Sequence, residues 1–503
     1  MEKFYLTTPI YYVNGQPSIG HAYTNITADI IARYQRMIGN EVFFMTGTDE
    51  NSQKNVEAAE KAGRADDIQG YLDEMSALWQ QSFDTLGLTH DRFIRTTEAD
   101  HKKAVEKFWQ AVDAKGDIYK GEYQGLYCTG CEAFVTESEL VEGKCQIHKR
   151  APESIKEENY FFKLSNYRQA LLDHIEKNPD FIMPKSRRNE VVSYIDKFMT
   201  DISITRQSMK WGIPAPGDAN QRIYVWFDAL INYLTGVGYG TDDQRFEKWW
   251  PANLHLVGKD IIKFHCALWP AMLMSAGLPL PKQVLAHGFF TIDGEKMSKS
   301  LGNVIDPLPI VQDYGNDALR FFLMREIRLG EDGDFSLSRL AERYDGELAN
   351  ELGNLVHRVL SMTEKYFEGE IPERAEQTAK AEAMKNYQAN MDEFRLPDAL
   401  EAVWKIVREA NQFIELKKPW VLAKNEDLHE LSDTMYLSLE TLRVLAWLIN
   451  PFMPETAVKI LTKLGLDPGT EFAQDYFSGL TWGKLAPGGK IDKGEALFPR
   501  REE

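Results

Sequence analysis

Two spacings of hydrophobic residues alternate at the start of the chain. Residues 4–8 are mostly aromatic and β-branched, which predicts a strand that ends at Pro9. Turn-forming residues fill 13–17, and apolar residues then recur every fourth position from Ala22 to Tyr34. Spacing of this kind predicts a helix with one buried face.

This helix is expected to stop at Gly39 and Asn40, and a second strand is expected over 41–46. A strand, loop, helix and strand in this order predict the beginning of a parallel α/β sheet. Turn residues and cysteines then dominate 116–200. Strand-like segments return at 223–226, 254–257 and 284–286. We interpret 116–200 as a small module inserted between two halves of one α/β domain.

After about residue 336 the apolar residues recur at three- and four-residue spacing, which predicts a bundle of helices. The clearest segments are 348–366, 400–416 and 435–448. The predicted organisation is an α/β domain in two halves (1–115 and 201–335), the inserted module (116–200), an all-α domain (336–485) and a short tail (486–503).

Composition and charge narrow the class of protein. The chain has 503 residues, of which 43% are hydrophobic and 27% are charged, as in ordinary globular enzymes. It has no run of about 18 uncharged apolar residues, and its first residues enter a strand instead of a signal peptide, so we expect no membrane span and a cytoplasmic location. The net charge of −18 disfavours a polyanionic partner on average, although a local basic patch can still bind one.

Three of the four cysteines lie within eighteen residues and form a pattern with a histidine. Cys128, Cys131, Cys145 and His148 have the spacing C-x2-C-x13-C-x2-H. Three thiolates and one imidazole suit tetrahedral zinc, and a site closed by four protein ligands is structural. The alternative is a module that keeps reduced cysteines and has lost its metal. Cys266 stands alone and is expected to be buried.

Two glycine-containing segments could bind a nucleotide. Residues 17–21 lie at the predicted start of the first helix, where unpaired amides and the helix dipole favour a phosphate. Gly20 would let a ligand approach the backbone, and His21 could donate a hydrogen bond to a phosphate oxygen. The second segment, 294–303, carries two lysines that could neutralise the charge of departing pyrophosphate. Taken alone, the first segment would more often be a packing detail. The alternative for the second is a solvated basic loop, which its five-residue string 296–300 disfavours.

The second segment contains a known signature. Lys296, Met297, Ser298, Lys299 and Ser300 match the KMSKS motif of class I aminoacyl-tRNA synthetases letter for letter, and Ser18, Ile19, Gly20 and His21 resemble their HIGH motif. The order and separation of the two motifs also fit that class. Over almost the whole chain, further strings resemble methionyl-tRNA synthetases of the bacterial type with a single zinc knuckle. These strings are 8–15, 46–50, 224–229, 258–261 and 264–265.

The resemblance implies a fold and an activity. The fold is a Rossmann-like parallel-sheet catalytic domain, split by a zinc-bearing connective insertion and followed by an anticodon-binding helical bundle. The activity is that of a methionine–tRNA ligase, in which L-methionine and ATP form methionyl-adenylate and pyrophosphate, and the methionyl group then passes to the 3′ end of tRNA(Met). The implied cofactors are one structural zinc and Mg²⁺ with ATP. Some methionyl enzymes continue into a dimerising domain that we do not find after the bundle, so a monomer is expected.

The resemblance also assigns residues by position. The implied catalytic residues are His21, Lys296 and Lys299, and Arg206 is implied to lie near them. The implied methionine-binding residues are Ile10, Tyr12, Asp49, Trp226, Ala229, Leu230, Tyr233, Ile261 and His265, with Asp49 on the substrate ammonium. The implied ATP contacts are His21, Gly258, Asp260, His287 and Lys299. The implied anticodon contacts are Asn354, Arg358, Pro419 and Trp420.

Two positions depart from the family pattern. Ser18 stands in place of the first histidine of HIGH, and Asn51-Ser52 follow Asp49-Glu50 where the family usually has His-Gly. Both substitutes can form hydrogen bonds, so activity is expected to survive. The rival interpretations are a synthetase for another amino acid such as cysteine or leucine, a catalytically silent tRNA-binding protein, and a small-molecule nucleotidylyltransferase. The short insertion disfavours the leucyl, isoleucyl and valyl enzymes, which carry a large editing domain there.

Overall fold

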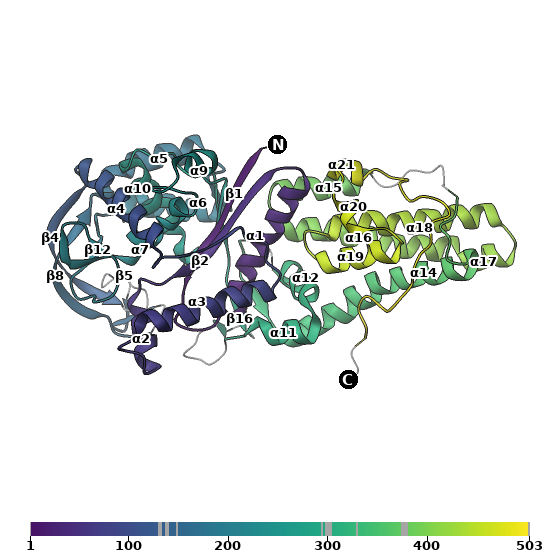
Figure 1. Ribbon diagram of the computed structural model, residues 1–503, viewed down its shortest axis with the longest axis horizontal. Helices are drawn as coiled ribbons and strands as arrows, with labels where there is room; N and C mark the ends of the chain where they lie inside the picture. The colour runs from purple at the N-terminus through teal and green to yellow at the C-terminus, as the bar shows by residue number, and fades with distance from the viewer. Residues whose placement is uncertain are drawn as a thin grey trace. The chain divides into compact units, whose positions relative to one another are not determined.

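The computed structural model describes residues 2–128, 133–135, 140–146, 149–292, 295–296, 304–327, 330–373 and 381–500. The chain forms two compact units (Figure 1). The first, here called the sheet unit, consists of Lys3–Ala28 and Val42–His287. The second, the helical unit, consists of Met1–Glu2, Asp29–Glu41 and Gly288–Glu503. Within the described parts of the chain, no helix combines the length and the apolar character needed to span a bilayer.

A six-stranded sheet forms the centre of the sheet unit. Its strands lie in the order β3 (Arg92–Arg95), β2 (Glu41–Asp49), β1 (Lys3–Tyr12), β14 (Leu254–Gly258), β15 (Val284–His287) and β9 (Ile182–Met183). Strand β2 pairs with β3, β1 with β14, β14 with β15, and β15 with β9, all in parallel. The predicted parallel α/β sheet is confirmed. The chain leaves β1 for β2 on one side, while β14 lies on the other, and ligands bind at the carboxyl ends of strands around such a switch point.

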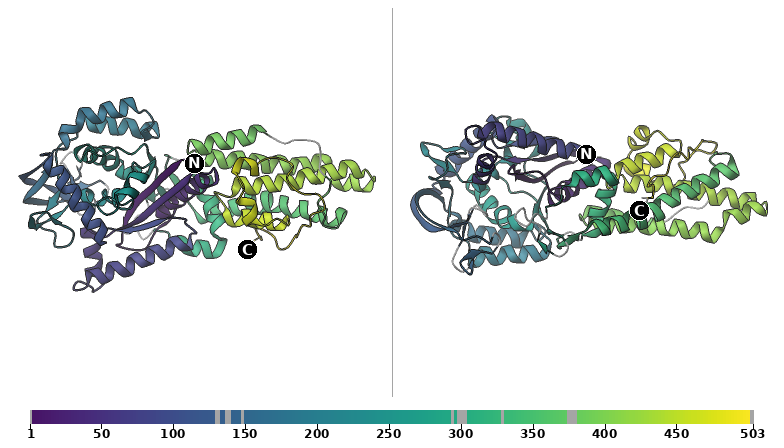
Figure 2. Two further views of the ribbon diagram at one scale, coloured as in Figure 1. Left: turned by 45° about the horizontal axis from the view of Figure 1, so that its top comes forward. Right: turned by 90° about the horizontal axis from the view of Figure 1, so that it is seen from below.

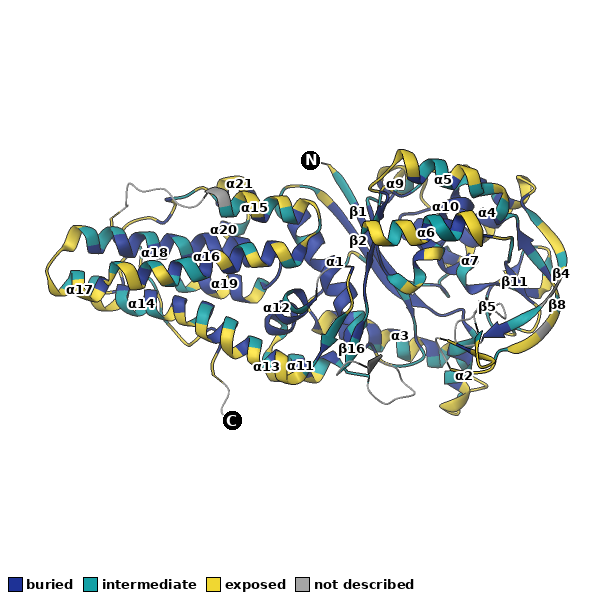
Figure 3. Cartoon of the chain, turned by 180° about the vertical axis from the view of Figure 1, so that it is seen from behind, coloured by how far each residue is buried: buried dark blue, intermediate teal, exposed yellow. Residues whose placement is uncertain are grey.

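Helices around the sheet bury the face that lies against it (Figure 3). They include α1 (Ile19–Met37), α3 (Ile68–Thr85), α4 (Ala99–Ala114) and α10 (Trp269–Ser275). The predicted apolar face of α1 is buried, with Ala22, Ile26 and Ile30 fully inaccessible. Large aromatic side chains fill the core, among them Phe108 of α4 and Trp269 of α10, whose rings stack 6.1 Å apart. Buried apolar area of this kind is the main stabilising term of the unit.

The first strand continues beyond Pro9, where the sequence predicted its end. Strand β1 runs to Tyr12. Its pairing with β14 places Leu6 opposite Leu254 and Thr7 opposite His255, before the proline is reached. Proline lacks an amide hydrogen but adopts an extended backbone, so it is tolerated where no ladder hydrogen bond is donated.

The segment 223–226 is not a strand of the central sheet, so this prediction was wrong. Strand β13 (Asp218–Ile223) ends there and belongs to a three-stranded sheet with β11 (Thr205–Arg206) and β12 (Pro214–Ala215). The chain then turns into the short helix α7 (Val225–Ala229). A short apolar run that is buried on all sides fits a strand or a helix equally well, because its spacing carries no information.

Between α4 and α10 the chain builds an antiparallel sheet in the order β10-β8-β4-β5. Its long pair is β4 (Ile118–Cys128) with β8 (Glu153–Phe162), flanked by β10 (Ile202–Ser203) and β5 (Ala133–Val135). A small hairpin, β6 (Leu140–Val141) and β7 (Lys144–Cys145), precedes β8. The range 116–200 also contains α5 (Arg168–Lys177), β9 and α6 (Lys185–Lys197), of which β9 pairs into the central sheet.

The helical unit begins with a small sheet of β16 (Phe290–Ile292), β17 (Glu295–Lys296) and β18 (Gly333–Phe335). Its helices include α12 (Asn316–Glu326), α14 (Asn354–Phe367), α15 (Ala381–Asp392), α16 (Leu396–Lys417), α17 (Pro419–Lys424), α18 (Leu428–Ile449) and α19 (Pro454–Lys463). The three long helices α14, α16 and α18 pack side by side (Figure 2). The predicted helical bundle is confirmed.

Candidate active site

The residues expected to bind methionine and ATP meet at one edge of the central sheet. Tyr12 ends β1, Asp49 ends β2, Gly258 ends β14 and His287 ends β15. Because these strands are parallel, their carboxyl ends lie at the same edge. Gly258 and His287 are direct partners in the β14–β15 register. The start of α1 follows β1 at this edge, so the HIGH-like motif faces the switch point.

Hydrogen bonds between Ser18 and His21 stabilise the start of α1. The carbonyl of Ser18 accepts from the amide of Ala22 at 3.0 Å, which makes Ser18 the N-cap. Its own amide donates to Nδ1 of His21 at 2.9 Å, and its Oγ lies 3.0 Å from the same nitrogen. A backbone amide can only donate, so Nδ1 carries no proton, and the neutral ring holds its proton on Nε2. The ring therefore has a donor for a phosphate oxygen, as the motif requires.

Aromatic packing orients the His21 ring. It contacts Tyr11 edge-on with centroids 4.9 Å apart and lies at the same distance from Trp79 of α3. Trp79 in turn donates from Nε1 to the carbonyl of Gly15 at 2.8 Å. The loop before α1 is thus tied to α3. Tyr11 and Trp79 stack on each other with centroids 5.1 Å apart, and the histidine packs against this pair.

His287 is linked to the same helix start through Thr24. The hydroxyl of Thr24 donates to the carbonyl of Gly20 at 3.1 Å, and its oxygen lies 2.8 Å from Nε2 of His287. The single hydroxyl proton is used on the carbonyl, so His287 donates from Nε2 to that oxygen. Three predicted ATP contacts, His21, Gly258 and His287, are therefore brought together. Asp260 follows on an exposed turn in the short segment Lys259–Ile261.

A buried pair of rings forms the centre of the expected methionine pocket. The hydroxyl of Tyr233, in α8 (Asn232–Thr235), lies 2.7 Å from Nε2 of His265. Nδ1 of His265 lies 2.9 Å from the carbonyl of Ile261 and must donate to it, so Nε2 accepts the tyrosine proton. Burial lowers the pKa of His265 to about 4 and raises that of Tyr233, so both rings are neutral at physiological pH.

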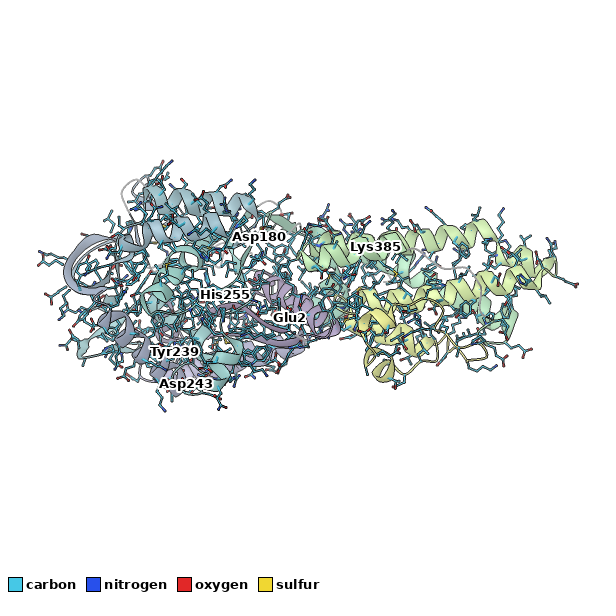
Figure 4. All side chains as sticks on the ribbon, turned by 90° about the horizontal axis from the view of Figure 1, so that it is seen from above. Glu2, Asp180, Tyr239, Asp243, His255 and Lys385 are labelled. Atoms are coloured by element: carbon cyan, nitrogen blue, oxygen red, sulfur yellow. The ribbon has the colours of Figure 1, made fainter. Side chains whose placement is uncertain are left out.

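A second buried histidine, His255 on β14 (Figure 4), stands behind this pair. Nε1 of Trp269 donates to its Nε2 at 3.3 Å, so its proton is on Nδ1, 2.6 Å from the hydroxyl of Thr7. Burial, with His265 nearby, lowers the pKa of His255 well below its usual value. The ring of Tyr233 lies against it with centroids 4.4 Å apart and planes tilted by 33°. The wall behind Tyr233 is therefore aromatic and uncharged.

The other residues expected in the pocket lie around these rings. Trp226 of α7 stacks on Phe264, with centroids 3.9 Å apart and planes 4° from parallel. Ala229 and Leu230 are buried, while Ile10, Tyr12, Trp226 and Ile261 are half-buried. The ammonium of Lys54 lies 4.7 Å from the centre of the Tyr12 ring. Arg206 lies 4.2 Å above the ring of Tyr224, the N-cap of α7, and donates to the carbonyl of Thr205 at 2.7 Å.

Several buried polar side chains at this edge were not predicted. Glu50, which follows Asp49, is fully buried and pairs with Nε and Nη2 of Arg95 at 2.7 and 3.2 Å. Asp228 of α7 contacts both Asn51 and His101. Asp228 lies inside the string 224–229 that resembles the family, which was a signal for it. His101 lies in an ordinary helical pattern, so the sequence offered no signal that it belongs to the site.

Most of the KMSKS motif lies outside the described residues, namely Met297, Ser298, Lys299 and Ser300. Of Lys296, the structure describes only the backbone, in β17, which pairs with β16 through Thr291 opposite Lys296. The roles expected for these lysines stay predictions.

Two of the four expected zinc ligands are described. Cys128 ends β4 and Cys145 ends β7, and each is 3% exposed. Neither is in a disulfide. The amide of Cys145 donates to the carbonyl of Arg150 at 2.9 Å, and its carbonyl accepts from Lys149, which closes a turn over 145–150. Cys131 and His148 lie outside the described residues, and no cluster of three or more metal-binding side chains occurs among the described ones.

The residues expected to read the anticodon lie in the helical unit. Asn354 begins α14 and is exposed, and Arg358 follows one turn later. Nη2 of Arg358 pairs with Glu415 of α16 at 2.6 Å. Lys418, with a φ of 49°, ends α16 and caps α17, whose first residues are the buried Pro419 and the 40% exposed Trp420. The Arg358–Glu415 pair thus ties α14 to the corner that carries Trp420.

Comparison with known proteins gives a consistent result over the whole chain. A model of class I tRNA synthetases of the methionine type matches residues 4–150 and 131–360, and a model of the anticodon-binding domain of methionyl tRNA ligase matches residues 368–503. The methionine–tRNA ligase of Thermotoga maritima is 46% identical over 99% of this chain and 80% of its own length. That of Streptomyces coelicolor is 42% identical over 100% of this chain and 97% of its own. The structure of Mycobacterium tuberculosis methionyl-tRNA synthetase with methionyl-adenylate has a TM-score of 0.94 at 41% identity, over 99% of this chain and 100% of that one. The chain therefore belongs to the class I methionyl-tRNA synthetases, the family of methionine–tRNA ligases.

Proposed function

We propose that this chain activates L-methionine with ATP and transfers it to tRNA(Met), using the residues placed above. One observation carries this proposal: Tyr12 and Asp49, which are expected to bind methionine, and the start of α1, which is expected to bind phosphate, lie at the same edge of the parallel sheet. The proposed form is a monomer that works in the cytoplasm, where ATP, methionine and tRNA are available.

The pocket suits a thioether side chain. A thioether has almost no polar handle, so its recognition depends on shape and on sulfur–aromatic contacts worth roughly 0.3–1.5 kcal/mol each. Tyr12, Trp226 and Tyr233 supply aromatic surface. The neutral state of His265 matters, because a charged imidazolium would have to be desolvated beside an apolar ligand. Asp49 is proposed to accept hydrogen bonds from the substrate ammonium.

In the first step, a carboxylate oxygen of methionine attacks the α-phosphorus of ATP in line, and the bond to the bridging oxygen of pyrophosphate breaks. The amides at the start of α1 and Nε2–H of His21 are proposed to stabilise the charge on the phosphate oxygens. Lys296 and Lys299 are proposed to stabilise the leaving pyrophosphate, by their match to the motif. Mg²⁺ bound with ATP would add positive charge against the phosphates. Positioning and electrostatics suffice, and no side chain becomes covalently bound.

In the second step, a hydroxyl of the terminal adenosine of tRNA attacks the methionyl carbonyl, and AMP leaves. Selection of tRNA is proposed to occur in the helical unit, where Asn354, Arg358 and Trp420 would contact anticodon bases. Splayed bases are recognised by stacking on aromatic rings and by hydrogen bonds from forked side chains. The exposed ring of Trp420 is suited to the first role and the guanidinium of Arg358 to the second.

The test is amino-acid-dependent exchange of pyrophosphate into ATP, measured with each proteinogenic amino acid in turn. We expect exchange with methionine alone. Exchange with another amino acid would keep the adenylation chemistry and overturn the pocket assignment. Absence of exchange with every amino acid, in folded and zinc-loaded protein, would instead favour a tRNA-binding protein without catalysis.

We also propose a structural zinc held by Cys128, Cys131, Cys145 and His148. The described pair fits this role, because both thiols are buried, reduced and placed at strand ends next to a closed turn. Thiolate and imidazole donors are what tetrahedral zinc prefers. Zinc would cross-link the end of the long strand β4 to the end of the two-residue strand β7.

Removal of zinc should destabilise this antiparallel region. We expect a chelated protein, and a Cys145→Ser variant, to lose the metal and to unfold with a midpoint lower by roughly 5–10 °C, since a loss of 1–2 kcal/mol shifts a small domain by about that much. Metal analysis together with thermal unfolding checks this, and restored zinc should reverse the effect in the chelated protein alone. A metal-free protein with unchanged midpoint and exchange activity would exclude a structural role.

A further inference from the structure

Asp228 lies at the junction of three elements of the sheet unit. It is fully buried in α7, between Phe227 and Ala229. Its Oδ1 lies 2.7 Å from Nε2 of His101 on α4, and its Oδ2 accepts from Nδ2 of Asn51 at 2.8 Å. Both oxygens of one buried carboxylate are thus used by side chains that are themselves no more than 2% exposed.

The hydrogen bonds around His101 determine the charge of this pair. The hydroxyl of Thr235 donates to the carbonyl of Ile231 at 3.1 Å, so its oxygen must accept from Nδ1 of His101, also at 3.1 Å. Nδ1 therefore carries a proton, and a second proton lies between Nε2 and Oδ1 of Asp228. Whichever of these two atoms holds the second proton, His101 and Asp228 together carry no net charge. A neutral buried pair of this kind avoids the cost of an isolated buried carboxylate.

Asn51 connects this pair to the carboxylate that is proposed to bind the substrate ammonium. Its backbone amide donates to Oδ1 of Asp49 at 3.3 Å. Its side-chain amide donates to Asp228 and, at 3.2 Å, to the carbonyl of Thr96. Both side-chain partners are acceptors, so the orientation of the amide is defined. One residue therefore sets the end of β2 against α7, the helix that carries Trp226 and Ala229 of the methionine pocket.

We propose that Asn51, held by the neutral Asp228–His101 pair, is a positioning residue that sets the affinity for methionine by keeping Asp49 in register with helix α7. This proposal rests on the proposed function and refines it. Asn51 does not touch the reacting atoms. It acts by keeping a fixed distance between the ammonium site and the side-chain pocket. The ammonium and the side chain of methionine must match that distance to bind at the same time.

The test uses a charge swap. In Asn51→Asp a new carboxylate faces Asp228, and both the hydrogen bond and the neutrality are lost. In the double variant Asn51→Asp with Asp228→Asn, the amide of residue 228 donates to the new carboxylate and its oxygen accepts from His101, at the net charge of the unchanged protein. The hydrogen bond from residue 51 to the carbonyl of Thr96 stays lost in both variants, so the comparison isolates the contact with residue 228. The exposed Asn220→Asp serves as the control for added charge.

Pyrophosphate exchange is measured at varied methionine and varied ATP, with active sites counted by titration. For Asn51→Asp we expect a KM for methionine at least tenfold higher, with the KM for ATP and the turnover per active site within about threefold. The double variant should recover part of the methionine KM, at least about threefold relative to Asn51→Asp, and Asn220→Asp should not change it. The idea is wrong if the double variant is no better than Asn51→Asp, or if only the number of active sites falls. Absence of methionine-dependent exchange in the unchanged protein would contradict the proposed function instead.

Discussion

An Asp49→Asn variant should lose affinity for methionine by roughly 30–100-fold, because a hydrogen bond to a charged group is worth about 2–3 kcal/mol and each 1.4 kcal/mol is a factor of ten. Asp49 is 4% exposed at the end of β2, so few water molecules can replace the proposed interaction with the substrate ammonium. Asn keeps the shape and can still accept from the amide of Asn51, so the loop should persist. The methionine KM in pyrophosphate exchange measures the effect, while the KM for ATP should stay within about twofold.

A methionine analogue without the amino group gives the sharper comparison. It has no ammonium to lose, so the unchanged protein and Asp49→Asn should bind it with similar inhibition constants, and the difference seen with methionine should disappear. Asp84→Asn, on the exposed face of α3, is the matched control for removal of one carboxylate. If the analogue discriminates between the two proteins as strongly as methionine does, Asp49 supports the pocket in another way and the ammonium is held elsewhere.

The parallel sheet and the helical bundle could be predicted from spacing alone because their hydrophobic patterns are long. α1 repeats its apolar face over four turns, and α16 and α18 are 22 residues each, so tertiary context had little to override. The strand prediction for 223–226 was wrong for the opposite reason. The segment has only four residues, three of which are buried, so its spacing does not separate a strand from a helix, and Val225 begins a helix.

The candidate site was predictable as a set of positions, but its chemistry was not. Ser18 replaces a histidine, and the sequence could not show that its amide would fix the tautomer of His21. His101 and Asp228 are 127 positions apart, and no local pattern connects them. Hydrogen bonds between distant buried groups depend on where the fold places each donor, so they follow from the structure and not from spacing.

A Trp420→Ala variant should keep methionine activation and lose tRNA charging. Stacking of one base on an aromatic ring is worth about 1–3 kcal/mol, so kcat/KM for aminoacylation should fall roughly 10–100-fold while pyrophosphate exchange stays within about twofold. Trp420 is 40% exposed, and Leu416 and Leu428, which flank it in the sequence, are 78% and 67% exposed. Several exposed apolar side chains within one short stretch of chain favour a binding role. The buried Pro419 and the left-handed Lys418 fix the helix that presents the ring.

The control for this loss is Phe477→Ala, since Phe477 is another exposed aromatic residue of the helical unit, at 51%. It should charge tRNA normally. A tRNA with an altered anticodon completes the test. If its changed base already fails to stack on Trp420, removal of the Trp420 ring cannot remove that stacking interaction again. The unchanged protein should charge this tRNA poorly, and Trp420→Ala should charge it no worse. Equal loss of exchange and charging in Trp420→Ala would mean that the ring supports the fold. Full additivity of the two changes would place the anticodon contact on another surface.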